Sequence, residues 1–161
     1  MSTVRIREAR LPGDKPDILG FIGELQKFEH AFEANRRLDA QFAEEHYAAL
    51  VPQLLVDGGE VFIAEDAEAR AIGWTAVYEK AGEVYIGAEE RHFGFIAELY
   101  VVEAARGVGA GRLLIAACED WARKQGLATV RIGVLAGNSR AIGVYARAGY
   151  GPYSLEVRKR L

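Results

Sequence analysis

The chain has 161 residues, the size of one domain; half of them are hydrophobic and 27 % are charged, so it can bury a core and is not a disordered chain. The formal net charge of −3 argues against the broadly basic surface of a general nucleic-acid binder. A single cysteine, Cys118, excludes an intramolecular disulfide and a cysteine-based zinc site, and the three histidines are far apart, so we expect no metal.

The first half of the chain contains patterns of one strand, two helices and two further strands. Residues 3–8 alternate apolar and charged side chains, which is typical of a strand. Apolar residues recur at spacings of three and four in 17–30 and again in 38–55, so both stretches are predicted to be amphipathic helices. Two short apolar runs, 61–64 and 71–78, follow as the next predicted strands.

The second half continues with alternating strands and helices. Residues 94–102 form a longer predicted strand, and 109–125 carry the clearest helical pattern. The nearly continuous apolar run 128–135 is typical of a strand that is buried on both faces. A short helix is predicted over 138–148, and the alternation in 153–160 predicts a last strand. The order β-α-α-β-β-β-α-β-α-β indicates an α/β (α+β) protein, with helices packed on a mixed sheet.

Glycine is concentrated between the strand 94–102 and the helix 109–125. Eighteen of the 161 residues are glycine, about 11 % against a usual level of about 7 %, and Gly107, Gly109 and Gly111 lie within five positions. The first amides of a helix are unpaired and carry partial positive charge, and glycine lets a phosphate approach them closely. Neither a Walker A loop nor a dinucleotide-binding GxGxxG fits this spacing. The alternative is a turn whose small residues only allow tight packing.

This loop resembles the signature of the GNAT superfamily of N-acetyltransferases, Gln/Arg-x-x-Gly-x-Gly/Ala after a central strand. Arg106, Gly109 and Gly111 match it. A second family element, an Asn followed seven residues later by a Tyr and then by Gly-Phe/Tyr, is matched by Asn138, Tyr145 and the pair Gly149-Tyr150. The two motifs lie in the expected elements, and the resemblance covers essentially the whole chain.

The resemblance implies one GNAT-type N-acetyltransferase domain over 1–161, with a mostly antiparallel central sheet, that uses acetyl-coenzyme A. In that family the loop amides hold the pyrophosphate, and the backbone of the preceding strand pairs with the pantetheine arm. The cofactor-binding residues implied here come from that strand, the loop and the helix after it: Leu99, Val101, Val102, Arg106, Gly107, Val108, Gly109, Ala110, Gly111, Arg112, Asn138 and Tyr145.

The activity that the resemblance implies is transfer of an acetyl group to a primary amine, which attacks the thioester directly in a ternary complex. The hydroxyl of Tyr145 would protonate or stabilise the leaving thiolate. Asn138 would bond the cofactor or serve only as a helix N-cap. The alternative function is a non-catalytic or regulatory module of the same fold that binds coenzyme A or an acyl-coenzyme A.

Acetylation of an amine needs a proton acceptor, since an amine of pKa about 10.4 is almost entirely protonated at pH 7. Glu98 is the one acid in the strand 94–102, where a carboxylate is costly unless it is paired or functional. It is therefore the candidate catalytic base or holder of a water molecule. The alternative is an ion pair with an arginine under the sheet. His92 is a second candidate base.

The acceptor site is expected on the first two helices, where aromatic and acidic residues follow one another. The candidate substrate-binding residues are Phe28, Glu29, Phe32 and Glu33. An acidic rim would suit a cationic amine, although such charge runs are usually solvated surface. The acceptor, a small-molecule or peptide amine, is not specified by this pattern.

The remaining expectations concern location and partners. No apolar stretch is long enough to span a membrane, and 1–12 lack the apolar core of a secretory signal. We therefore expect a cytoplasmic protein without nucleic-acid or membrane partners. Dimers are common in the GNAT superfamily, which makes a homodimer an expectation as well.

Overall fold

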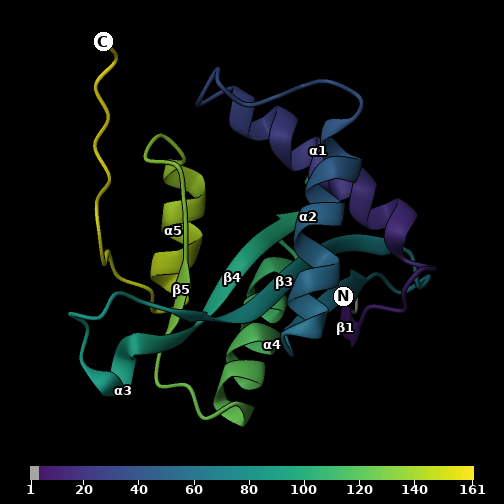
Figure 1. Ribbon diagram of the computed structural model, residues 1–161. Helices are drawn as coiled ribbons and strands as arrows, with labels where there is room; N and C mark the ends of the chain where they lie inside the picture. The colour runs from purple at the N-terminus through teal and green to yellow at the C-terminus, as the bar shows by residue number, and fades with distance from the viewer. Residues whose placement is uncertain (1–3) are drawn as a thin grey trace.

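The computed structural model describes residues 4–161 as a sheet with helices on both faces (Figure 1). In chain order the elements are β1 (Arg5–Glu8), α1 (Lys15–His30), α2 (Phe42–Val56), β2 (Glu60–Glu65), β3 (Ala71–Ala81), α3 (Ala88–Arg91), β4 (His92–Val101), the 3-10 helix η1 (Glu103–Ala105), α4 (Ala110–Lys124), β5 (Val130–Ile132) and α5 (Ser139–Arg147).

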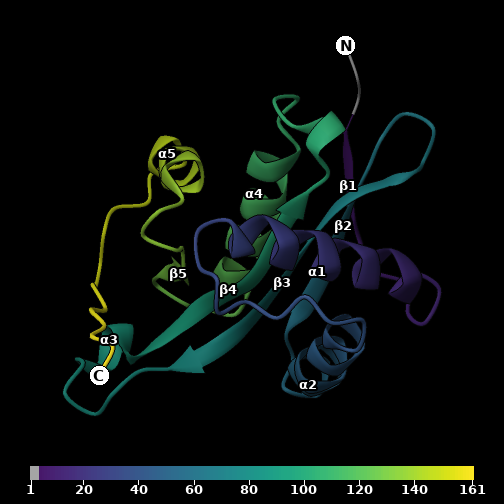
Figure 2. The same ribbon diagram turned by 90° about the horizontal axis from the view of Figure 1, so that it is seen from above.

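The five strands lie in the order in which they occur in the chain, β1-β2-β3-β4-β5. All neighbours pair antiparallel except β4 and β5, which are parallel. The helices α1 and α2 cover one face, α4 covers the opposite face, and α5 lies on the α4 side next to β5 (Figure 2). The predicted mixed, mostly antiparallel sheet with flanking helices is therefore confirmed.

The core lies on both faces of the sheet. On the α1–α2 side, Ile18, Val51 and Trp74 are fully buried in one cluster. On the α4 side, Leu114 and Cys118 are fully buried against β2, β3 and β4. Burial raises the pKa of the Cys118 thiol to about 12, so this cysteine is an inert part of the core at neutral pH.

A bulge in β4 decides which side chains face which helices. Ala76 pairs with Glu98 while its neighbour Val77 pairs with Ile96, so Ala97 is the extra residue on β4. Ile96 packs with the α4-side cluster. Without the bulge, the even-numbered residues after it would face the same side as Ile96; with the bulge, they face the α1–α2 side, as Tyr100 does. As a result the side chain of Glu98 faces α2 and contacts His46 of that helix.

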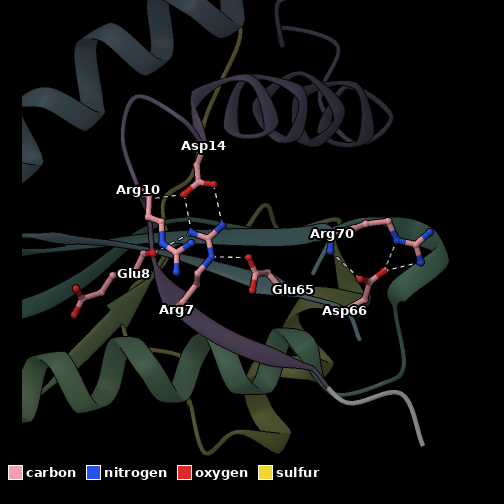
Figure 3. Close-up of polar contacts among 7 residues, drawn as sticks. All are labelled: Arg7, Glu8, Arg10, Asp14, Glu65, Asp66 and Arg70. Carbon is pink, nitrogen blue, oxygen red and sulfur yellow. Dashed lines mark hydrogen bonds and ion pairs between the residues drawn. The ribbon is translucent and has the colours of Figure 1, made fainter. Parts of the chain in front are cut away.

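Charged groups join β1, β2 and the start of α1 (Figure 3). The guanidinium of Arg7 donates to both carboxylate oxygens of Asp14 at 2.7 and 2.9 Å and to Glu65 at 2.6 Å. All three side chains are about nine-tenths buried. Arg7 holds the pKa of the Asp14 carboxyl below its usual value, chiefly through this hydrogen bond. The pairing fixes α1 against the edge of the sheet.

Three sequence predictions differ from the structure in extent or in kind. The second helix begins at Phe42, because 38–41 form a turn. β5 is limited to three residues and is a half-buried edge strand, so the interpretation of 128–135 as a strand buried on both faces is wrong. The last predicted strand, 153–160, is not formed, because the segment pairs with no neighbouring strand. The first predicted strand includes Thr3, which lies outside the described residues.

Candidate active site

β4 and β5 move apart beyond their paired residues (Figure 1), and a cleft lies between the chain segments that follow. The two strands pair over three positions, the last of them Ile96 with Ile132. Beyond this pair, 97–101 on β4 and 133–135 after β5 line opposite sides of a cavity of about 610 Å³, within the roughly 300–1,000 Å³ usual for small-molecule sites. Helices α1, α2, α4 and α5 complete its walls.

The loop between β4 and α4 offers free backbone donors to this cleft. Within residues 4–161, the amides of 107–112 donate to no protein acceptor. Gly107 and Gly109 have φ angles of +86° and +93°, which other L-residues rarely adopt, and Gly109 is the N-cap of α4. Unpaired amides at a helix N-terminus attract anions, so this loop fits a phosphate group.

Arginine side chains from the loop, α4 and α5 add positive charge to the cleft. Those that line it are Arg106, Arg112, Arg140 and Arg147. Arg106 does not extend freely into solvent, because its Nε donates to the Val101 carbonyl at 3.1 Å and its guanidinium lies 5.2 and 5.7 Å from the ring centres of Phe28 and Tyr100. The α4–α5 end of the cleft is therefore basic.

The helix α5 brings Asn138 and Tyr145 to the cleft, as the second motif predicts. The Asn138 side chain accepts a hydrogen bond from the Ala141 amide at 3.1 Å, so it caps α5. Burial raises the pKa of Tyr145 to about 12, and its hydroxyl makes no hydrogen bond within the described part of the chain. A protonated donor is thus available in the cleft wall at neutral pH.

Glu98 lies in the cleft and is paired with a histidine from α2. His46 Nε2 and Glu98 Oε1 are 2.6 Å apart, and the two side chains are 33 % and 11 % exposed. Phe42 stacks on the His46 ring with centres 5.4 Å apart. The hydrogen bond to Glu98 raises the pKa of His46 above its usual 6.5. The alternative to a catalytic Glu98 is an ion pair with an arginine, but the partner in the structure is His46.

Several predicted residues lie away from the cleft. Phe28 and Glu29 line it, whereas Phe32 packs against the Phe28 ring from outside and Glu33 pairs with Arg158 at 2.9 Å. Phe32 and Glu33 follow the end of α1 at His30 and are not among the residues that line the cleft. His92, the second candidate base, lies outside the cleft, exposed and paired with Glu79 at 2.6 Å.

The strand residues before the loop also separate into two groups. Leu99 and Val101 line the cleft. Val102 does not, because its amide donates to the Ile72 carbonyl and its carbonyl accepts from the Ala105 amide. Within the loop, the Val108 side chain is exposed and only its backbone amide remains available.

The residue that the sequence analysis missed is His46. Phe42 and His46 are four positions apart on α2, a spacing that indicates contact between the two rings. The pair with Glu98 joins residues 52 positions apart, so no local pattern reveals it.

Comparison with known proteins gives the family. The family model described as the acetyltransferase (GNAT) family matches residues 22–150. This chain belongs to the GNAT family of acetyltransferases. The acetyltransferase is 30 % identical over 119 residues, 74 % of each chain, to the aminoglycoside N(6')-acetyltransferase type 1 of Stenotrophomonas maltophilia.

Solved structures show the same fold. A tetramutant of the BH1408 protein from Bacillus halodurans has a TM-score of 0.82 at 18 % identity, covering 98 % of the acetyltransferase and 99 % of that chain. The aminoglycoside N-acetyltransferase AAC(6')-Iy in complex with CoA has a TM-score of 0.68 at 21 % identity, covering 98 % and 100 %.

Two features are absent from the part of the acetyltransferase that the structure describes. In 4–161, no helix has both the length and the apolar character that crossing a membrane requires. Over the same part of the chain, no three His, Cys, Asp or Glu side chains are grouped so that they could hold a metal ion.

Proposed function

We propose that this acetyltransferase moves the acetyl group of acetyl-coenzyme A to a primary amine, with both substrates bound together. The observation that carries the proposal is a single cleft that has anion-binding groups at one end and carboxylates at the other. The α4–α5 end has free amides and arginines, which suit the phosphates of coenzyme A. The α1–α2 end contains Glu29 and Glu98, which suit a cationic amine.

The residues that would hold the coenzyme fit its chemistry. When bound, coenzyme A supplies an acetyl group activated as a thioester. The amides of 107–112 would bind the pyrophosphate, and Arg112 and Arg140 at the same end would balance further phosphate charge. The Tyr145 hydroxyl is protonated at neutral pH, with a pKa that burial raises to about 12, and would donate a hydrogen bond to the departing sulfur.

Glu98 is the proposed proton acceptor. His46 occupies its Oε1 at 2.6 Å, while Oε2 has no hydrogen-bond partner within residues 4–161 and is free to accept a proton from the amine or from an intervening water. His46 acts through Glu98, because the imidazole fixes the orientation of the carboxylate. Holding amine and thioester together supplies the larger part of the rate, a contribution of up to roughly 7–11 kcal/mol.

The proposed acceptor is a polycationic amine, and an aminoglycoside is the first to be tested. This follows from the acidic α1–α2 end and from the name of the 30 % identical relative, an aminoglycoside N(6')-acetyltransferase. The Glu29 carboxylate is held at the cleft by Arg36 at 3.0 Å, so its position there is defined.

Thiol release from acetyl-coenzyme A in the presence of an aminoglycoside, a polyamine and a lysine peptide tests the proposal. We expect saturable turnover with at least one amine. Tyr145→Phe should lower turnover roughly 10- to 100-fold, because a hydrogen bond to a developing thiolate is lost. Tyr150→Phe is the matched control, since Tyr150 bonds Glu119 at 3.1 Å outside the cleft.

Two outcomes would count against this function. Saturable binding of acetyl-coenzyme A without turnover on any amine would favour a binding module of the same fold. Equal losses of turnover in Tyr145→Phe and Tyr150→Phe would show that the Tyr145 hydroxyl has no specific part in the reaction.

A further inference from the structure

The last two turns of α1 reach the cleft without a buried residue of their own. The buried residues of this helix, Ile18, Phe21 and Ile22, all lie in its first half. Phe28 and Glu29 line the cleft from the last turn, and the chain from there to α2 forms no further helix or strand. Helix ends fray where few contacts hold them, so the position of Glu29 depends on the side chains around it.

The side chain of Arg106 makes such a contact from the loop that follows β4. Its Nε donates to the Val101 carbonyl at 3.1 Å, which fixes the direction of the guanidinium. The guanidinium carbon lies 5.2 Å from the ring centre of Phe28 and 5.7 Å from that of Tyr100, within the range of cation–π attraction. Since Tyr100 belongs to β4 and is buried, Arg106 joins the end of α1 to the central strand.

Phe28 extends this contact toward α5. Its ring meets the Phe32 ring edge to face, with the two centres 5.2 Å apart. Phe32 lies over Gly137, where an added Cβ would come within 3.4 Å of the Phe32 ring. Gly137 directly precedes Asn138, the N-cap of α5. A row of contacts thus runs from Arg106 through two phenylalanine rings to the loop before α5.

Glu29 is the neighbour of Phe28 and is held from another direction. Arg36 Nε donates to its carboxylate at 3.0 Å, and the Arg36 carbonyl lies 2.9 Å from His30 Nδ1. Contacts at Phe28 and at Glu29 therefore fix the same turn of α1. Misplacing a group that positions a substrate by about 1 Å can slow a reaction by about 10²-fold, so this turn is a sensitive one.

We propose that the side chain of Arg106 is a positioning residue for the amine, although it lies in the loop of the proposed coenzyme site. Its guanidinium holds Phe28, and Phe28 holds the turn of α1 that carries Glu29. The inference rests on the proposed function, in which Glu29 receives the cationic acceptor. The amides after Arg106 remain free for the phosphates of the coenzyme.

The charge of Arg106 alone predicts the opposite effect on the amine. Its guanidinium is a cation beside residues that receive a cationic substrate. Removing this charge without moving any other group should therefore strengthen amine binding and lower the KM for the amine. Loss of positioning should raise this KM instead. The direction of the change distinguishes the two roles.

Arg106→Gln tests the proposal, because glutamine keeps an N–H donor near the place of Nε but has no guanidinium to reach the two rings. At saturating acetyl-coenzyme A, we expect the KM for the best amine to rise about 5- to 20-fold. The dissociation constant for coenzyme A, measured by titration calorimetry, should stay within about threefold.

Arg112→Gln is the matched control, since Arg112 lines the same cleft with an exposed side chain. It should show the opposite pattern, with the dissociation constant for coenzyme A raised about fivefold or more and the amine KM unchanged. An amine KM that is unchanged or lower in Arg106→Gln would overturn the proposal. The same holds if Arg106→Gln and Arg112→Gln both act on coenzyme A alone.

Hydrogen exchange follows the end of α1 without any substrate. The amides of 28–32 should exchange faster in Arg106→Gln than in the unmodified protein, whereas those of 18–22 should not change. Phe28→Ala should give the same change, and the double variant should add nothing further, because the two substitutions break one contact. Unchanged exchange in 28–32 would overturn the proposal even where turnover is normal. Absence of turnover with every amine would instead count against the proposed function.

Discussion

The two ends of the cleft are built in different ways. The α4–α5 end comes from two short contiguous segments, a loop with free amides and a helix with a capping Asn138. The α1–α2 end comes from side chains far apart in the chain, above all His46 and Glu98. A phosphate site built from backbone donors depends little on side-chain identity. It can therefore stay the same while the side chains that bind the amine substrate change. The difference suggests that coenzyme binding and amine chemistry can be separated by mutation.

The largest expected effect is on turnover at the α1–α2 end. Glu98→Gln keeps the size of the side chain but removes its capacity to accept a proton, so we expect kcat to fall by roughly 10²- to 10⁴-fold. Glu79→Gln is the matched control, because Glu79 forms the other 2.6 Å histidine pair, with His92, outside the cleft. Steady-state thiol release measures both variants, and an unchanged kcat in Glu98→Gln would remove Glu98 from the reaction.

A change remote from both ends should affect stability alone. Arg7→Ala leaves the carboxylates of Asp14 and Glu65 buried without their partner, so we expect a loss of about 3 kcal/mol in the free energy of unfolding (Figure 3). Arg70→Ala removes the exposed pair with Asp66 in the same view and should change stability little. Urea unfolding measures both. Equal losses of unfolding free energy in the two variants would contradict the claim that burial makes the Arg7 ion pairs matter more than the exposed Arg70 pair.

The loss of folding stability at acid pH follows from the same ion pair. The pKa of Asp14 is lowered in the folded state, so its contribution is present above the unfolded value of about 3.9 and is lost as pH falls through the folded one. Unfolding measured from pH 6 to pH 2 should therefore show the advantage of the unmodified protein over Asp14→Asn shrinking with acid. An advantage that is constant with pH would contradict this assignment.

The proposed coenzyme-binding role of the α4–α5 end is tested by a substitution that changes the backbone conformation of its loop. Gly109→Val strains a residue at φ +93°, and because a Cβ there would meet no heavy atom within 4 Å, the strain is conformational. We expect the dissociation constant for coenzyme A to rise about tenfold, since about 1–2 kcal/mol of strain distorts the loop. Gly126→Val, at φ +76° beyond the other end of α4, imposes the same kind of strain and should leave this constant unchanged.

The smallest expected effect concerns pH. The pKa of His46 is raised by its bond to Glu98, so the pair's stability contribution is full below about 6.5 and is lost as pH rises through the folded value. The unmodified protein should lose its advantage over His46→Gln between pH 6 and 9. The change should stay below about 1 kcal/mol, because the histidine is partly exposed. If the stability advantage of the unmodified protein over His46→Gln grew as pH rises, the direction given for the His46 pKa would be wrong.

The parts of the site that lie in continuous stretches could be predicted from sequence. Gly107 and Gly109 precede a strongly amphipathic helix, and Asn138 lies seven positions before Tyr145; the residues of both motifs line the cleft. The bulge at Ala97 could not be predicted, because it depends on the register between β3 and β4. The pair of His46 and Glu98 depends on packing between distant elements.

The errors at the C-terminal end have a related cause. The apolar run 128–135 predicts a strand buried on both faces, yet Val134 and Leu135 line the cleft. The segment 153–160 has the correct alternation for a strand, but alternation does not identify a partner strand. A pattern of side chains thus predicts a conformation more reliably than it predicts what lies beside it.

The separation of the two ends is tested most directly by the dissociation constant of acetyl-coenzyme A for Glu98→Gln, measured by titration calorimetry. The account predicts a value within about twofold of the unmodified protein, because the carboxylate acts at the amine end alone. A dissociation constant weakened about tenfold or more, as expected for Gly109→Val, would show that Glu98 supports coenzyme binding and would contradict the separation.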